Sequence, residues 1–150
     1  MENDHQIQSM INSLKKKSSP IDKHFVLNNL IEVFSQKGDF KNSIYYCELD
    51  MNLINENDEL IEFLVDCEIP SLYYMDLMNE YKKFIPILKE IFNQQEILIQ
   101  KDLYKYPELK DKKESLRSFF YWLERGKFIQ RTKKGTSYEV KLKVPLNEIF

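Results

Sequence analysis

The spacing of apolar residues changes once along this chain, after Gly126, and that change constrains the fold most strongly. Before Gly126, apolar residues recur every three or four positions, which is typical of amphipathic helices. After it, the apolar residues of Tyr138–Leu142 alternate with charged ones, which predicts a strand. Phe128 and Ile129 would begin the preceding strand, and Gly135 would supply the positive φ of a tight turn. We therefore expect a mainly α-helical protein with a small antiparallel β-hairpin.

Prolines and polar breaks divide the rest of the chain into separate predicted elements. Helices are predicted at residues 5–17, 22–37, 40–54, 59–67, 70–81, 86–96 and 112–125, a short strand at 97–99, and one or two helical turns at 101–106. Asp22, Asp39 and the pair Asp111 and Glu114 are predicted helix caps, because their carboxylates can accept hydrogen bonds from backbone N–H groups. Residues 5–84 are therefore expected to form a helical bundle or a short helical repeat.

Charge divides the chain into an acidic front and a basic back. Residues 1–96 carry 9 Lys and Arg against 17 Asp and Glu, a net charge of −8, whereas residues 97–150 carry 13 against 7, a net of +6. We predict an acidic all-helical domain over residues 1–84 and a basic domain over residues 85–150. The basic part suits a polyanion partner, but attraction between the two parts of the molecule explains the split equally well.

Several classes of function find no support in the sequence. No carboxylate stands at a defined spacing from a His or a nucleophilic Ser or Cys, and no glycine-rich phosphate loop is present, so we expect neither an enzyme nor a bound cofactor. His5 and His24 each stand alone, which argues against a metal site. No run of about 18 apolar residues could span a membrane, and the N-terminus is acidic, unlike a secretory signal. Cys47 and Cys67 are therefore expected to be reduced core residues of a cytoplasmic protein.

The stretch LNNLIEVFSQKGDFKNSIYYCELDMNL has a helix, a turn at Gly38, and a second helix. Over about residues 25–54 this pattern resembles a tetratricopeptide-type repeat. The resemblance implies an antiparallel helical hairpin. Ser43 and Asp50 depart from it, because they stand where that family prefers alanine.

The order helix, short strand, helix, helix, strand, basic turn, strand over about residues 85–143 resembles a winged helix-turn-helix domain. The residues that carry this resemblance are ERGKFIQR at the end of the long helix and RTKKGTSYEV in the hairpin. In that family the long helix usually lies in the DNA major groove and the hairpin, or wing, tracks phosphates. The resemblance implies that the long helix faces DNA with Lys112, Lys113, Arg117, Ser118, Tyr121 and Arg125. The wing contacts would be Arg131, Lys133 and Lys134, and the nearby Lys141 also suits phosphate contacts.

Tyr121 and Trp122 are large side chains to leave in water on the long helix. They could cover the base of the hairpin, dock the helical part, or bind a partner. We expect a small DNA-binding protein, a transcriptional regulator, whose helical part dimerises or binds another protein. The alternative is a scaffold subunit whose winged helix binds protein and not DNA. The tail after Pro145 is expected to fold back on its own domain or on a partner subunit.

Overall fold

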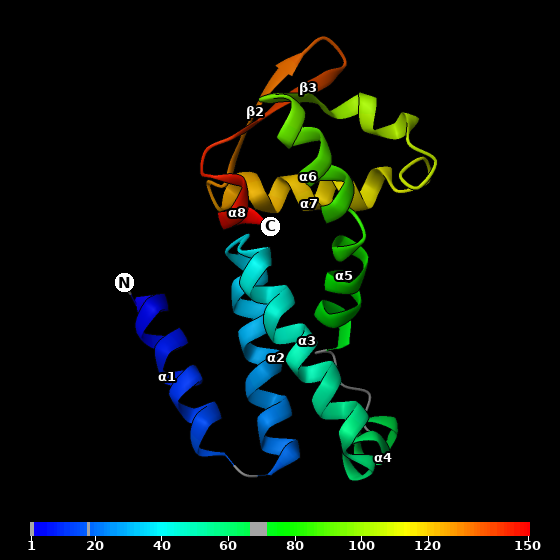
Figure 1. Cartoon of the computed structure of the whole chain (residues 1–150). Coiled ribbons are helices and arrows are strands. Elements are labelled where there is room, and N and C mark those ends of the chain that lie inside the picture. The colour runs from blue at the N-terminus through cyan, green and yellow to red at the C-terminus, as the bar shows by residue number, and fades with distance from the viewer. Residues whose placement is uncertain (1, 18, 67–71) are drawn as a thin grey trace. The chain divides into compact units, whose positions relative to one another are not determined.

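The structure, a computed structural model, describes residues 2–17, 19–66 and 72–150 (Figure 1). It is mainly helical, and a small three-stranded antiparallel sheet lies toward the C-terminal end of the chain. The predicted fold class is confirmed to that extent. None of the helices in these ranges combines the length and the apolar composition that crossing a membrane requires.

Contacts divide the chain into two compact units. The helical unit comprises Met1–Ser35 and Asn42–Met78, and the hairpin unit comprises Gln36–Lys41 and Asn79–Phe150. The short segment Gln36–Lys41, which holds the turn between two long helices and the adjoining helix ends, thus belongs to the hairpin unit. The sequence predicts two separate domains, over residues 1–84 and 85–150. That division stays a prediction.

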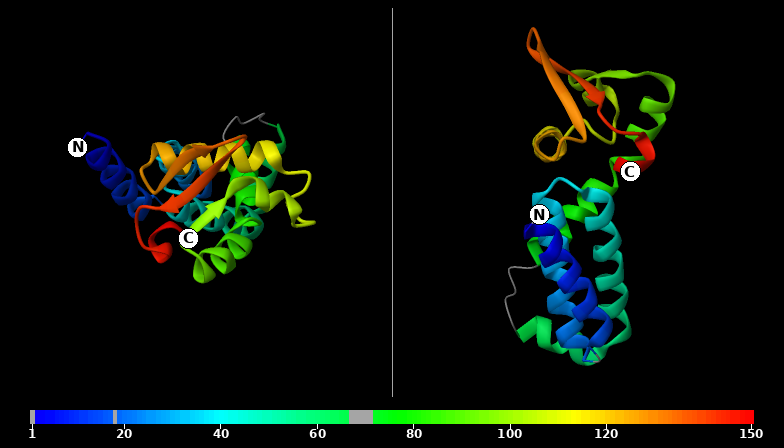
Figure 2. Two further views of the ribbon diagram at one scale, coloured as in Figure 1. Left: turned by 90° about the horizontal axis from the view of Figure 1, so that it is seen from above. Right: turned by 90° about the vertical axis from the view of Figure 1, so that its left-hand side faces the viewer.

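The helical unit is built on the predicted apolar stripes. Its elements are α1 (Glu2–Lys16), most of α2 (Pro20–Gln36) and α3 (Phe40–Glu56), α4 (Asp58–Asp66) and the first part of α5 (Leu72–Lys82). Ile7 of α1 packs with Leu30 and Phe34 of α2 in a buried cluster. The ring of Phe34 also stacks on Tyr46 of α3, with ring centroids 5.7 Å apart. These contacts explain why α1, α2 and α3 lie side by side (Figure 2).

Buried polar side chains also join α2 and α3. Ser43 Oγ lies 2.6 Å from Ser35 Oγ. Asp50 Oδ1 lies 2.7 Å from His24 Nδ1, and Asp50 Oδ2 accepts a 3.2 Å hydrogen bond from Asn28 Nδ2. All five residues are buried. The two positions where a tetratricopeptide-type repeat prefers alanine are therefore occupied here by hydrogen-bonded polar groups.

Of the two cysteines, the structure describes Cys47. Cys47 is buried in α3, as expected of a core residue. Cys67 and Pro70 lie outside the described residues, so the predictions made for them remain predictions.

The hairpin unit holds the sheet. After α5 come α6 (Ile85–Gln94), β1 (Ile97–Ile99), the 3₁₀ helix η1 (Gln100–Lys105), α7 (Lys113–Arg125), β2 (Ile129–Lys134), β3 (Ser137–Leu142) and α8 (Leu146–Ile149). The strand order is β1-β3-β2, and β3 is antiparallel to both neighbours. Lys134 pairs with Ser137 at the tight end of the β2–β3 hairpin, where Gly135 has the expected positive φ of 60°. The predicted short strand, long helix and hairpin are therefore all present.

The core of the hairpin unit is aromatic and centres on Phe119 of α7. Its ring lies 4.9 Å from the ring of Phe40, 4.9 Å from that of Tyr81 and 6.0 Å from that of Phe84. The predicted buried face of α7 is confirmed, because the four residues that define it are buried: Leu116, Phe119, Phe120 and Leu123.

The C-terminal tail packs on this same core. Ile149 is buried, and the ring of Phe150 lies 6.1 Å from that of Phe119. Of the two expected placements, the structure therefore has the tail folded back on its own chain.

Two predicted helix caps are wrong. Asp22 lies within the first turn of α2, because the helix already begins at Pro20, whose missing N–H needs no partner there. Asp111 lies in a turn before α7, whose N-cap is Lys112, and no side chain makes a capping hydrogen bond. Glu114 is exposed in the first turn of the helix.

Glu80 of α5 lies beside the start of α7 instead. Its Oε1 accepts a 3.0 Å hydrogen bond from Ser115 Oγ and lies 3.1 Å from Lys112 Nζ. Burial alone would raise the pKa of Glu80, but the hydrogen bonds from Lys112 and Ser115 and the charges of Lys112 and Lys83 outweigh it and lower the pKa. A carboxylate near a helix N-terminus is also favoured by the helix dipole.

We expect Glu80→Gln to remove a pH-dependent part of the stability. The folded-state pKa lies below the ordinary value of 4.5, so the carboxylate stabilises the fold above about pH 4.5 and this contribution is lost as the pH falls through the folded-state pKa. Urea unfolding near neutral pH should show a loss below about 1 kcal/mol, which disappears at low pH. Glu108→Gln, at an exposed position, is the control. A loss that stays constant with pH would contradict the assignment.

Two glycines meet at the C-terminal end of α7. Gly38 has φ +74°, and a Cβ atom there would lie 2.1 Å from the carbonyl oxygen of Trp122. A Cβ atom on Gly126 would lie 2.2 Å from the carbonyl oxygen of Lys37. Gly126 ends α7, as predicted, with an ordinary φ of −77°. The backbones of the two segments therefore approach more closely than any side chain permits.

Candidate nucleic-acid interface

A pocket of about 570 Å³ is lined by the exposed side of α7 and by the turn end of the β2–β3 hairpin. We call it the α7–hairpin pocket. It is lined by Arg117, Ser118, Tyr121 and Trp122 from α7, by Arg131, Lys133, Thr136 and Tyr138 from the hairpin, and by Gln100 from η1. The structure thus brings five of the ten predicted DNA-contacting residues together with both predicted partner-binding aromatics.

Arg131 forms one wall of the pocket. Its Nη2 lies 3.2 Å from Glu124 Oε1, and its backbone N–H donates to Glu124 Oε2 at 3.1 Å. Its Nη1 donates to Gln100 Oε1 at 3.4 Å, and its guanidinium lies 4.8 Å from the centroid of the Tyr138 ring. Only 9% of the side chain is exposed. Arg131 therefore ties β2 to α7, η1 and β3, and much of its charge is offset by Glu124.

Two aromatic rings of α7 also line the pocket. Tyr121 is 51% exposed and meets Trp122 edge to face, with ring centroids 5.9 Å apart. Trp122 is half-buried, and the guanidinium of Arg125 lies 5.2 Å from its ring centroid. Both rings thus lie beside the hairpin, as one of the three expected placements has it, but beside its turn end and not its base. Their proposed role in binding a partner protein stays a prediction.

Arg117 and Lys133 are the exposed cations of the pocket. Both are exposed, and within the described residues neither has an ion-pair or hydrogen-bond partner. Among the described residues that line the pocket, none is acidic. The side chains that line the pocket therefore carry a net positive charge, which can attract an anion.

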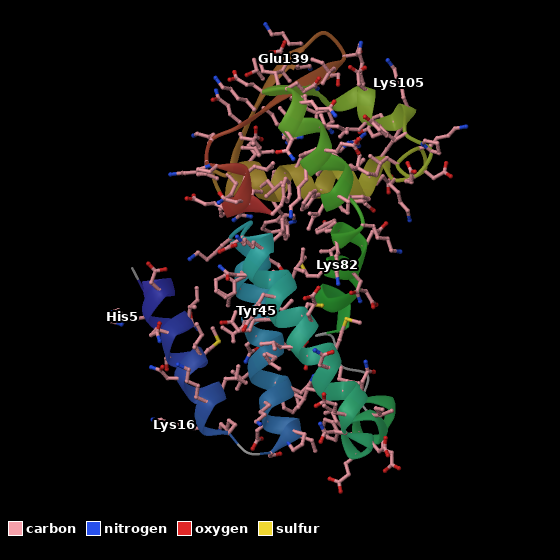
Figure 3. All side chains as sticks on the ribbon, viewed as in Figure 1. His5, Lys16, Tyr45, Lys82, Lys105 and Glu139 are labelled. Atoms are coloured by element: carbon pink, nitrogen blue, oxygen red, sulfur yellow. The ribbon has the colours of Figure 1, made fainter. Side chains whose placement is uncertain are left out.

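The remaining predicted DNA-contacting residues lie outside the pocket. Lys112 is paired with Glu80, and the ammonium of Lys113 lies 5.1 Å from the centroid of the Tyr104 ring. Arg125, Lys134 and Lys141 are exposed. Nitrogen-tipped side chains project from the hairpin around the labelled Glu139 (Figure 3). The assignment of all ten residues to DNA contact stays a prediction.

Sequence reasoning missed three residues of the pocket, namely Gln100, Thr136 and Tyr138. Gln100 reaches the site only because β1 pairs with β3, which places η1 beside the hairpin. Tyr138 offered a signal, since it is an aromatic residue in an otherwise charged part of the hairpin. Its ring is 37% exposed and faces the Arg131 guanidinium.

Comparisons give no further assignment. No family model, no curated protein and no solved structure matches this chain. Within the part of the chain that the structure describes, no three His, Cys, Asp or Glu side chains group so as to hold a metal ion.

Proposed function

We propose that the hairpin unit is a winged-helix domain that binds double-stranded DNA through α7 and the β2–β3 hairpin. The element order α6, β1, η1, α7, β2, β3 supports this proposal, because it is the order on which the resemblance to that family rests. The net charge of +6 over residues 97–150 supports it as well, since phosphate contacts dominate DNA affinity.

One observation carries the proposal. The exposed side of α7 and the hairpin share one surface, on which Arg117 and Lys133 are exposed and no lining residue among those described is acidic. A helix that enters the major groove and a hairpin that tracks phosphates need to face the DNA from the same side. The helical unit would then dimerise or bind another protein, which would place two such helices on a palindromic site.

Protein binding is the second candidate, and the exposed rings favour it. Tyr121 and Tyr138 leave 51% and 37% of their surface open on the same pocket. Tyrosine is enriched at protein interfaces because its ring is apolar and its hydroxyl is polar. A scaffold subunit would use this surface without any dependence on polyanions.

DNA titrations at two salt concentrations separate the two candidates. We expect the wild type to bind duplex DNA with an affinity that falls steeply with salt. The double variant Lys133→Ala/Lys134→Ala should lose about tenfold to a hundredfold in affinity and about 2 units of salt slope, because two phosphate contacts are removed.

The matched control is Lys15→Ala/Lys16→Ala, which removes two cations from the end of α1 in the helical unit. Arg131→Ala is a poorer test, since it also leaves Glu124 without its partner. If DNA binding did not depend on salt, or if the control and the hairpin variant lost equal DNA affinity, the protein-binding scaffold would be favoured.

A further inference from the structure

We propose that the α7–hairpin pocket holds one unpaired nucleotide of the bound DNA, so that the hairpin unit prefers DNA with an unpaired base to fully paired duplex. The inference rests on the proposed DNA binding and adds the form of DNA that is recognised. The ligand chemistry is an aromatic base that carries a phosphate.

The rings in the pocket argue for a base face. Tyr121 and Tyr138 are exposed, Trp122 is half-buried, and all three line the same hollow. A duplex covers its base faces by stacking and offers only base edges and phosphates to a protein. An unpaired base offers its face, which stacks on aromatic side chains with little dependence on sequence. Rings in this position therefore fit an unpaired base better than a closed groove.

The cations argue for a phosphate next to that base. Arg117 and Lys133 are exposed on the pocket, while Arg131 is held in the wall by Glu124 and Gln100. The two cations free to meet a ligand therefore line the same pocket as the rings. A nucleotide has the complementary groups, with an apolar ring at one end and a negative phosphate at the other.

The size of the pocket limits what can enter it. At about 570 Å³ it falls within the range of roughly 300–1,000 Å³ that is typical of small-molecule sites. A single unpaired nucleotide fits such a space. A base that is paired and stacked within a double helix does not enter it. A second hollow, beside η1, contains Tyr106 but also Asp102, whose charge would repel a phosphate.

Trp122 gives a direct measure of occupancy, because it is the only tryptophan in the sequence and it lines the pocket. Three DNAs are titrated while its fluorescence is followed: a fully paired duplex, the same duplex with one unpaired thymine, and a single strand of equal length. We expect the DNAs with unpaired bases to quench Trp122 and to bind about tenfold tighter than the paired duplex, as one stacked base allows.

Three variants test the stacking. Tyr138→Ala and Tyr121→Ala should each reduce the ratio of the affinity for unpaired DNA to the affinity for paired duplex several-fold, whereas Tyr121→Phe should keep that ratio. The matched control is Tyr45→Ala in α3 (Figure 3), a tyrosine that is 55% exposed in the helical unit. Far-ultraviolet circular dichroism of each variant verifies that it folds.

The outcomes separate a failure of the pocket assignment from a failure of the proposed DNA binding. Equal wild-type affinity for paired and unpaired DNA would overturn the pocket assignment and leave the proposed DNA binding intact. Absence of salt-dependent binding to any of the DNAs would overturn both. If a free mononucleotide quenched Trp122 at the same concentration as the DNA with an unpaired base, the ligand would be a free nucleotide and not a nucleotide of DNA. That result would overturn the proposal.

Discussion

Gly126→Ala is expected to lower the free energy of unfolding by about 3 kcal/mol, at the upper end of overpacking costs. The added Cβ atom would lie 2.2 Å from the carbonyl oxygen of Lys37, a backbone atom that no rotamer change can move. Gly38→Ala should cost about 4 kcal/mol, because a similar 2.1 Å clash with the Trp122 carbonyl is joined by the strain of a positive φ. Both changes affect the same contact within the hairpin unit.

Gly135→Ala is the matched control. Gly135 also has a positive φ, of 60°, but nothing lies within 4 Å of an added Cβ atom, so the expected cost is only about 1 kcal/mol. Denaturant unfolding followed by the fluorescence of Trp122 reports on the hairpin unit in all three variants. Costs that are equal for Gly126→Ala and Gly135→Ala would contradict the close approach of Gly126 and Lys37.

Asp50→Ala is expected to destabilise the helical unit by about 3 kcal/mol or more. The Asp50 carboxylate accepts hydrogen bonds in a site where Asp50 and His24 are 0% exposed, with Asp50 Oδ1 2.7 Å from His24 Nδ1. Its loss leaves His24 and Asn28 buried without their acceptor. Burial raises the pKa of Asp50, and the hydrogen bonds and charge from His24 and Asn28 oppose that rise only in part.

The variants Asp50→Asn and Glu56→Ala complete this test. Asp50→Asn keeps one acceptor oxygen and should cost clearly less than Asp50→Ala. Glu56→Ala removes an exposed acid from the end of the same helix and should change stability by no more than about 0.5 kcal/mol. Circular dichroism at increasing denaturant gives all three values. A cost for Asp50→Ala as small as that for Glu56→Ala would show that the buried pair contributes little.

The raised pKa of Asp50 also determines whether its contribution to stability increases or decreases with pH. Since the folded-state pKa lies above the ordinary value of 3.8, the stability contribution of this group is largest at low pH and decreases as the pH rises through the folded-state pKa. This direction is opposite to that expected for Glu80. The Asp50→Asn variant should therefore lose the decrease with rising pH and keep the Glu80 contribution.

Much of the fold could be predicted because local pattern and local structure coincide. The apolar residues Leu116, Phe119, Phe120 and Leu123 recur at helical spacing, and all four are buried on one side of α7. The alternation in Tyr138–Leu142 likewise matches β3, where Val140 is buried. The caps failed at Asp22 and Asp111, because several nearby residues can start a helix and the choice depends on neighbouring turns.

The candidate site could be predicted only in part. The sequence indicated which cations α7 and the hairpin carry, but it did not indicate that Arg131 would be held by Glu124 and Gln100. Gln100 and Arg131 are 31 positions apart, and only strand pairing brings them together. Hydrophobic periodicity carries no information about such polar contacts.

The sequence by itself determined where helices and strands form, because each element's apolar spacing reflects the single face that it buries. It also determined that the cations are concentrated after residue 96. Only the tertiary structure decided which of those cations are free, which rings line the α7–hairpin pocket, and why Gly126 must be glycine. These properties depend on contacts between segments distant in the chain, such as Lys37 with Gly126, and no local spacing encodes them.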